Sequence, residues 1–204
     1  MNKDWLSVLI PAYNPGKRLR GLLEQLKAQI TEYPDVEIIV IDDGSDEDIR
    51  WVKEYPNVRY KRQKNGGEGN ARNALLKMAK GEYIQFLDAD DEIFGNCLSV
   101  IFGNINAGYD WVSYDWLCDG SKEAAYQNKG ILMVNCAVWA YTFRKSFIGG
   151  VKFDETLKTG CDQVWLKQVL TDESKHRHDN SVFYNYLWME NVNSLCHKKA
   201  RGEI

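Results

Sequence analysis

Residues 82–93 read EYIQFLDADDEI and join a strand-like segment to a group of acids. The first half is aromatic and aliphatic, a composition typical of a strand inside a β-sheet. The second half places four acids among five consecutive positions: Asp88, Asp90, Asp91 and Glu92. Crowded carboxylates repel one another, which raises their pKa values unless a cation lies nearby. The stretch therefore predicts a buried strand that ends at a site for a cation or for a ligand that brings one.

Alternating strands and helices extend outward from this stretch over the first half of the chain. Apolar runs predict strands over 6–13, 36–42, 57–62 and 82–88, and helical patterns cover 19–31, 44–55 and 69–81. The first strand is expected to stop at Pro11, which cannot donate to a central ladder. Ser45 or Asp46 is expected to cap the second helix, and Gly81 to close the third.

This order predicts an α/β fold with a mostly parallel central sheet and helices on both faces. In such sheets ligands bind beyond the carboxyl ends of the strands. Asp42–Asp43 and Asp88–Asp91 both fall at predicted strand ends, so we expect them to converge. The second half is rich in tryptophan, with strand-like pieces at 110–117, 138–143 and 182–188 and a helix over 162–171. Without a linker between the halves, we expect one domain over 1–204, with a smaller second lobe.

Composition excludes several classes of protein. The 204 residues carry a formal net charge of −3, which disfavours a nucleic-acid binder with a basic face. Five scattered cysteines form no Cys-x-x-Cys pair, so we expect reduced thiols and a cytoplasmic location. No apolar run reaches the ~20 residues that a membrane span needs. The sequence leaves open a peripheral contact with the inner face of a membrane.

Four segments, taken in order, resemble the inverting glycosyltransferases of family 2, which have the GT-A fold. The segments are SVLIPAYN (7–14), IVIDDGSDE (39–47), GNARNALLKMAKGEYIQFLDADD (69–91) and VWAYTFRKSFIGGVKFDETLKTGCDQVWLKQVL (138–170). The resemblance covers roughly residues 5 to 195, and the ordered set is far more specific than any one piece. It implies a nucleotide-sugar-binding half over about 1–107 and an acceptor-side half over about 108–204.

The resemblance identifies Asp88-Ala89-Asp90 as an Asp-x-Asp motif. A nucleotide-sugar diphosphate needs a hard divalent cation, and oxygen ligands suit Mg²⁺ or Mn²⁺. By resemblance Asp90 is a metal ligand, and Asp88 lies near the ribose or the metal. Asp91 receives no firm role. The alternative interpretation is an acidic turn that caps the next helix.

The resemblance also implies that Asp42 and Asp43 contact the nucleotide base and ribose. The alternative is an Asx turn in which Gly44 has a positive φ, and both interpretations can hold together.

Pro11, Ala12 and Tyr13 are expected to line the base pocket, although core packing is an equal alternative for Tyr13. Arg72 and Asn73 open a predicted helix and are expected to approach the nucleotide. A surface ion pair is the alternative for Arg72.

In the acceptor-side half, the resemblance implies that Asp162 is the general base that removes the proton of the acceptor hydroxyl. Family members usually carry Glu-Asp here, whereas this chain has Cys161-Asp162. A helix N-cap is the alternative for Asp162. Trp139 and Trp165 could stack on an acceptor sugar, although tryptophan is more often packed in a core.

The sequence thus predicts a metal-dependent, inverting transfer of a sugar from a nucleotide-sugar, most simply UDP-linked, to a hydroxyl of a glycan or lipid-linked acceptor. A non-catalytic nucleotide- or glycan-binding module of the same fold is the first alternative. A nucleotidyltransferase is disfavoured, because PAYNPGKR (11–18) lacks the glycine- and basic-rich signature that such an enzyme would need near its first strand.

Overall fold

The computed structural model describes residues 5–119, 121–124, 137–171, 173–187, 198 and 201–203. Its centre is one sheet with the strand order β3-β2-β1-β4-β8-β6-β9-β5, and β7 pairs with β6. The strands are β1 Leu6–Ala12, β2 Val36–Asp42, β3 Val58–Arg62, β4 Tyr83–Phe86, β5 Glu92–Ile93, β6 Trp111–Cys118, β7 Ser121–Ala124, β8 Tyr141–Arg144 and β9 His176–Tyr186.

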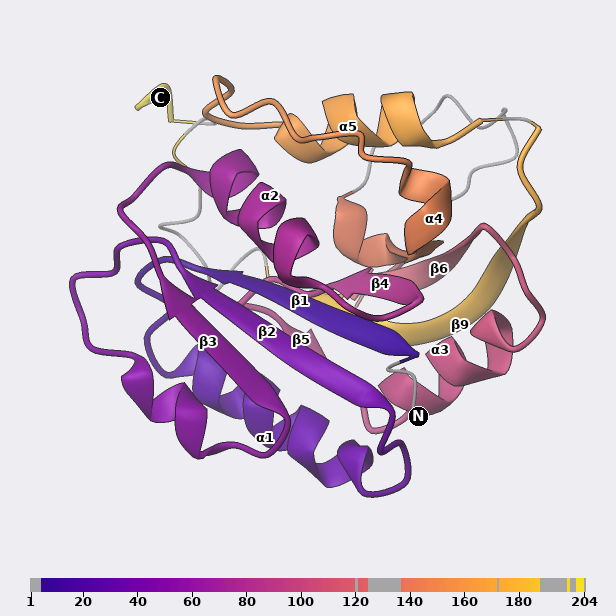
Figure 1. The fold of residues 1–204 in the computed structure, drawn as a ribbon, viewed down its shortest axis with the longest axis horizontal. Coiled ribbons are helices and arrows are strands. Elements are labelled where there is room, and N and C mark those ends of the chain that lie inside the picture. Colours follow the sequence, from indigo (N-terminus) through magenta and orange to yellow (C-terminus); the bar gives the residue numbers. More distant parts are fainter. Residues whose placement is uncertain are drawn as a thin grey trace.

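Helices cover both faces of this sheet (Figure 1). The α-helices are α1 Arg18–Ile30, α2 Glu68–Met78, α3 Cys97–Ile105, α4 Lys145–Ile148 and α5 Cys161–Val169, with short 3₁₀ helices η1 Arg50–Glu54 and η2 Val138–Ala140. In Figure 1, α1 and α3 lie below the sheet, whereas α2, α4 and α5 lie above it. None of the helices in the described segments has the length and apolarity needed to cross a membrane.

Strands β3, β2, β1 and β4 are mutually parallel, as the alternating sequence pattern predicts. Every residue of β2 is buried, which explains its unbroken hydrophobic run. The register places Ala12 beside Asp42 and Asp42 beside Arg62, so these three strands end in one row. The loops that follow them therefore leave the sheet at the same edge.

The second half of the chain continues the same sheet. Strand β8 pairs antiparallel with β4, with Ile84 opposite Phe143, and β6 pairs antiparallel with β8. Strand β9 runs parallel to β6, and β5 closes the sheet against β9. Because β4 and β8 are neighbours, the acidic stretch after β4 lies between the two halves of the chain.

Pro11 does not end β1, contrary to the sequence prediction, because it still pairs with Ile41 on β2. Leu9 O accepts from Leu87 N, so the backbone N–H and C=O groups of the odd-numbered residues of β1 point toward β4. Strand β4 ends at Phe86. The missing N–H of Pro11 therefore falls beyond the end of β4, where no ladder needs it.

Two helix boundaries also differ from the prediction. Residues 44–55 form no α-helix but only the 3₁₀ helix η1, because Ser45 and Asp46 bind Asn14 and cap nothing. Helix α2 ends at Met78, before Gly81. A Cβ at Gly81 would lie 2.5 Å from Ser7 N, so glycine is required there for its close approach to β1.

Candidate active site

The loops after β1, β2 and β4 meet at the edge of the sheet. Asp43 N donates to Ala12 O at 2.8 Å, and Leu87 N donates to Leu9 O at 3.0 Å. Tyr13, directly after β1, is 53% exposed, so core packing is wrong for this residue. The structure thus brings the predicted nucleotide-binding segments together at one edge.

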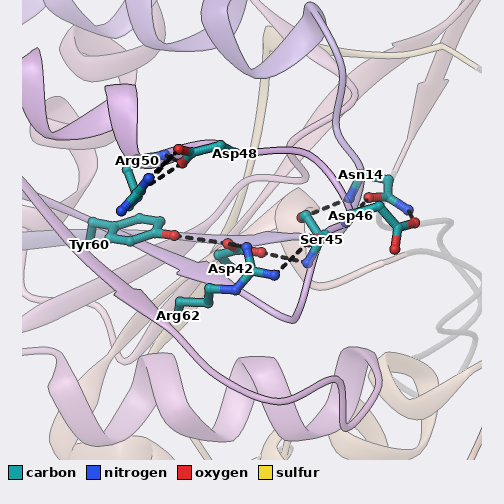
Figure 2. A network of polar contacts seen from close by, with 8 residues as sticks. All are labelled: Asn14, Asp42, Ser45, Asp46, Asp48, Arg50, Tyr60 and Arg62. Atoms are coloured by element: carbon teal, nitrogen blue, oxygen red, sulfur yellow. Dashed lines mark hydrogen bonds and ion pairs between the residues drawn. The ribbon is translucent and has the colours of Figure 1, made fainter.

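Asp42 is fully buried, and protein donors bind both of its oxygens (Figure 2). Ser45 N donates to Oδ1 at 2.8 Å, while Tyr60 Oη and Arg62 Nη1 donate to Oδ2 at 2.8 and 2.9 Å. Burial and the hydrogen bond to Asp42 raise the pKa of Tyr60 to about 12. Gly44 has a φ of +80°, so the turn interpretation is confirmed. Protein donors thus occupy both oxygens of Asp42, and its direct contact with a nucleotide stays a prediction.

The same network links the loop after β1 to the loop after β2 (Figure 2). Asn14 N donates to Ser45 Oγ at 3.0 Å, and Asn14 and Asp46 exchange two further hydrogen bonds at 2.7 and 2.9 Å. Beside it, Arg50 and Asp48 form an exposed ion pair at 2.6 Å. A surface depression of about 320 Å³ is lined by Asp46, Glu47, Asp48, Arg50 and Arg62. Neither Arg72 nor Asp88 lines this depression, so it is not the reaction site.

Asp43 holds the loop that leads into α2. Its carboxylate accepts from Gln63 Nε2 at 2.8 Å, from Gly66 N at 3.0 Å and from Gly67 N at 2.8 Å. Only 3% of Asp43 is exposed. Asp43 therefore shapes the loop beside the expected nucleotide, and its oxygens are occupied by the protein.

Arg72 is the centre of a buried charge cluster. Its Nη2 lies 2.8 Å from Glu68 Oε1 and 3.1 Å from Asp88 Oδ1, and Asp162 also interacts with it electrostatically. The guanidinium lies over the Phe153 ring at 5.6 Å. Arg72 is 0% exposed, so the surface ion-pair interpretation is wrong. Four charged groups from three separate segments of the chain converge here.

Three carboxylates share this single guanidinium, and the pKa values of two of them, Glu68 and Asp162, are raised. Burial raises the pKa of Glu68 to about 7, with further contributions from Asp88 and Asp162, although Arg72 opposes the shift. Burial also raises the pKa of Asp162, and Asp88 adds to the effect. The cluster therefore carries more negative than positive charge when its acids are ionised.

Asp91 differs from Asp88 and Asp90 in its burial and in its hydrogen-bond partners. Asp91 is buried and accepts from Tyr184 Oη at 2.5 Å and from Leu187 N at 3.0 Å. Burial and the adjacent Asp88 and Asp90 raise the pKa of Asp91 well above its usual range. Asp91 thus anchors the acidic loop to β9, whereas Asp88 and Asp90 remain partly exposed.

The donor set fits a divalent cation that arrives with phosphate. Within the described residues no three His, Cys, Asp or Glu side chains form a ready-made metal site. Asp88 and Asp90 could supply one or two oxygens, and a diphosphate would complete the shell. The surplus of carboxylates around Arg72 favours a positive charge at this position.

Helix α5 delivers Asp162 to the cluster. The helix begins at Cys161 after Gly160, whose φ is +73°. Asp162 is therefore the second residue of the helix, and the N-cap interpretation is wrong. Cys161 Sγ lies 3.5 Å from both Glu68 Oε2 and Arg72 Nη1. Burial raises the pKa of Cys161 to about 12, which disfavours a thiolate nucleophile.

Trp139 and Trp165 belong to the core, which corrects their expected role as acceptor platforms. Trp165 is 0% exposed, stacks on Phe153 at 4.6 Å and donates from Nε1 to Val151 O at 3.1 Å. Trp139 is 4% exposed and stacks on Tyr184 at 4.3 Å. Neither ring offers a face to a sugar. Trp188 and His197, in the C-terminal part of the chain, lie outside the described residues.

Sequence reasoning missed Glu68 and Tyr184. Glu68 directly precedes the predicted helix 69–81 and lies four residues before Arg72, a spacing that indicates an ion pair once the helix is extended by one residue. Tyr184 reaches Asp91 across 93 positions, and no local pattern reports such a contact.

A parallel sheet with acidic loops at its carboxyl edge, continued by a mixed second half, defines the GT-A fold of glycosyltransferases. The family model of glycosyl transferase family 2 matches residues 7–169, and the chain belongs to this family.

Relatives agree with the assignment. The uncharacterized glycosyltransferase YibD of Escherichia coli K12 is 42% identical over 98% of this chain and 66% of that protein. The poly(ribitol-phosphate) β-N-acetylglucosaminyltransferase TarP of Staphylococcus aureus is 36% identical over 97% of this chain and 67% of its own length. The crystal structure of S. aureus TarS residues 1–349 with UDP superposes with a TM-score of 0.79 at 23% identity, over 90% of this chain and 60% of that one. The chain thus spans about two thirds of the length of these proteins.

Proposed function

We propose that this chain transfers a sugar from a UDP-linked donor to a hydroxyl of a glycan or lipid-linked acceptor, with inversion at the anomeric carbon. The observation that carries the proposal is the convergence of Arg72, Asp88 and Asp162 at the carboxyl edge of the sheet. They come from α2, the loop after β4 and α5. No requirement of core packing explains why three acids, Glu68, Asp88 and Asp162, surround one buried arginine.

Relatives support the donor and the acceptor class. A crystal structure of TarS contains UDP-GlcNAc, and TarP is named for the transfer of N-acetylglucosamine to poly(ribitol-phosphate). A 27% identical protein of Campylobacter jejuni is named as a β-1,3-glucosyltransferase that acts on an undecaprenol-linked saccharide. These names favour a polymeric or lipid-linked acceptor. An acceptor carried on a lipid would bring this chain to a membrane surface, and the cytoplasmic side remains our prediction.

Different residues would act on the donor and on the acceptor. Asp90, with Asp88, would hold Mg²⁺ or Mn²⁺, which as a Lewis acid stabilises the charge on a departing diphosphate. Arg72 holds Asp88 in place from within the protein. Asp162 would accept the proton of the acceptor hydroxyl, and its raised pKa makes it a stronger base than an exposed aspartate. Tyr13, exposed beside the ends of β1 and β2, would contact the base.

A donor panel tests the proposal. UDP-, GDP- and dTDP-sugars are incubated with Mn²⁺, Mg²⁺ or chelator and with ribitol-phosphate polymer or lipid-linked saccharides, and released diphosphate and glycosylated product are measured. We expect metal-dependent release with a UDP-sugar and a product of inverted configuration. Tight nucleotide binding without turnover for any pair would favour a non-catalytic binding module. Release of pyrophosphate from a nucleoside triphosphate would indicate a nucleotidyltransferase.

A further inference from the structure

Glu68 bridges two helices at the candidate active site. It is the first residue of α2, and its Oε1 lies 2.8 Å from Arg72 Nη2. Its Oε2 accepts from Cys161 Sγ at 3.5 Å, across 93 positions of sequence. Cys161 opens α5 and directly precedes Asp162. One carboxylate thus touches both the arginine that holds Asp88 and the residue that precedes the predicted base.

The surroundings hold this bridge in a defined place. Asn73 Nδ2 donates to Phe153 O at 3.0 Å, and Phe153 N donates back to Asn73 Oδ1 at 2.8 Å. A Cβ at Gly69 would lie 2.9 Å from Asp154 O, so the start of α2 approaches the segment before α5 closely. Because the backbone on both sides is fixed, Glu68 does not fill a loose surface position.

The charges at the bridge make Glu68 hard to replace. Arg72 Nη2 serves Glu68 and Asp88 together, and Arg72 Nε has no hydrogen-bond partner among the described residues. Loss of the Glu68 carboxylate would remove the shortest of the guanidinium's contacts. A buried guanidinium with an unmet donor moves toward its remaining acceptors, which here include Asp88. A shift of that kind would change the relative position of Asp88 and Asp162.

We infer that Glu68 is a positioning residue of the transfer reaction: one carboxylate oxygen holds Arg72 beside Asp88, and the other holds Cys161 and thereby the first turn that carries Asp162. The inference rests on the proposed function and adds a residue to it. Glu68 acts through Arg72 and Cys161 and has no assigned contact with substrate.

The first test compares Glu68→Gln with a matched control, Glu155→Gln. Glu155 accepts from Asn70 Nδ2 and Asn73 Nδ2, both at 2.8 Å, so it contacts the same helix from outside the cluster. We expect Glu68→Gln to lower kcat by about 10- to 100-fold, the loss that a misplaced reacting group causes. Affinity for the UDP-sugar and the melting temperature should change little, and Glu155→Gln should match the parent throughout.

A charge relocation separates positioning from plain packing. Since Cys161 Sγ already touches Glu68 Oε2, a carboxylate installed at position 161 would enter the same space. In the parent background Cys161→Glu places two acids together, and we expect slower transfer. In the Glu68→Gln background the same change returns a carboxylate to the bridge, and kcat should recover by about tenfold. A merely structural role for Glu68 would make both changes harmful and additive.

Hydrogen exchange of the segment 160–166 provides a readout that needs no turnover. We expect Glu68→Gln to speed the exchange of this segment, with no change at α1, and Glu155→Gln to leave it as in the parent. If the parent transfers no sugar at all while Glu68→Gln still speeds exchange, the proposed function fails and the bridge stands. The inference is overturned if Glu68→Gln turns over and exchanges like the parent, or if its loss of rate follows a lowered melting temperature and the double variant recovers nothing.

Discussion

Arg72 Nη2 and Asp88 Oδ1 lie 3.1 Å apart and join α2 to the acidic loop after β4. The arginine side chain is 1% exposed and that of Asp88 is 22% exposed, so the pair has one buried and one accessible partner. Removal of one member of a buried ion pair costs about 3–5 kcal/mol, because the other charge is left unmatched. Substitution of Arg72 would therefore lower stability and activity together, and the two effects could not be separated. Substitutions of the residues around Arg72 are more informative.

A substitution of Asp90 tests its predicted role as a metal ligand. Asp90→Asn preserves the volume of the side chain and removes its charge, so UDP affinity in Mn²⁺ should fall by more than about tenfold, since even outer-shell partners of metals contribute 10- to 100-fold. Affinity in chelator should stay as in the parent. Calorimetry with UDP, with and without Mn²⁺, measures both values. Asp154→Asn, at an exposed carboxylate that binds Thr156, is the control for lost charge. Equal binding by Asp90→Asn and the parent would disprove the metal assignment.

A substitution of Asp162 tests its predicted role as the general base. Asp162→Asn should lower kcat by ~10²–10⁴, the usual contribution of a general base, while donor affinity remains, since this contact matters in the transition state. A base must be deprotonated, and burial raises the pKa of Asp162. Activity of the parent should therefore be lost, as the pH falls, at a higher pH than an exposed aspartate would give. Transfer by Asp162→Asn at the parental rate would place the base elsewhere.

Asp43 tests the loop before α2. Asp43→Ala leaves Gly66 N and Gly67 N without their carboxylate, so stability should fall by about 1–3 kcal/mol. Exchange of residues 63–67 should quicken, and UDP should bind more weakly even in chelator. Asp48→Ala removes an exposed carboxylate and should change none of these three properties. Unaltered UDP binding by Asp43→Ala would reduce this loop to a structural element.

Asp91 tests the pH dependence of stability. Burial holds the pKa of Asp91 well above its usual range, so ionisation is costly in the folded state. Its favourable contribution is complete at low pH and is lost as the pH rises through the raised pKa. Asp91→Asn removes this dependence, so the stability of the variant relative to the parent should rise with pH. Urea unfolding from pH 4 to 9 in chelator measures the difference.

Asp179 supplies the control of opposite sign. Burial alone would raise the pKa of Asp179, but hydrogen bonds from Ser181 and Asn104 lower it. Its contribution is present above the unfolded pKa and is lost as the pH falls through the folded pKa. Asp179→Asn should therefore be less stable than the parent at neutral pH, and the difference should shrink on acidification. The same trend in both variants would contradict the assignment of Asp91 as a buried anchor.

Substitutions of Trp165 and Tyr13 test whether the first residue belongs to the core and the second to the nucleotide site. Trp165→Phe loses the hydrogen bond to Val151 O and should cost about 1–2 kcal/mol of stability, with the KM for acceptor unchanged. Tyr13→Ala, at an exposed ring, should leave stability unchanged and weaken nucleotide binding. Denaturant unfolding and acceptor kinetics decide the first case, and calorimetry decides the second. A raised acceptor KM in Trp165→Phe would restore the sugar-stacking interpretation.

The sequence by itself determined the scaffold of the sheet. The apolar runs at 6–12 and 36–42 are strands whose two faces are both buried beneath helices, and α1, α2 and α5 follow from apolar residues at helical spacing. The acidic segments fell at strand ends for the same local reason, and parallel pairing then brought those ends to one edge. Local periodicity carries this information, so it can be read without the fold.

Only the tertiary structure decided which partner each polar group took. Ser45 had the signature of a helix cap, but it accepts from Asn14, and the predicted helix shrank to η1. Asp43 turned to the loop before α2, and Glu68 reached Cys161. A buried carboxylate must find donors wherever packing brings them, and those donors are often dozens of residues away. That requirement depends on three-dimensional distance, which no spacing along the chain encodes.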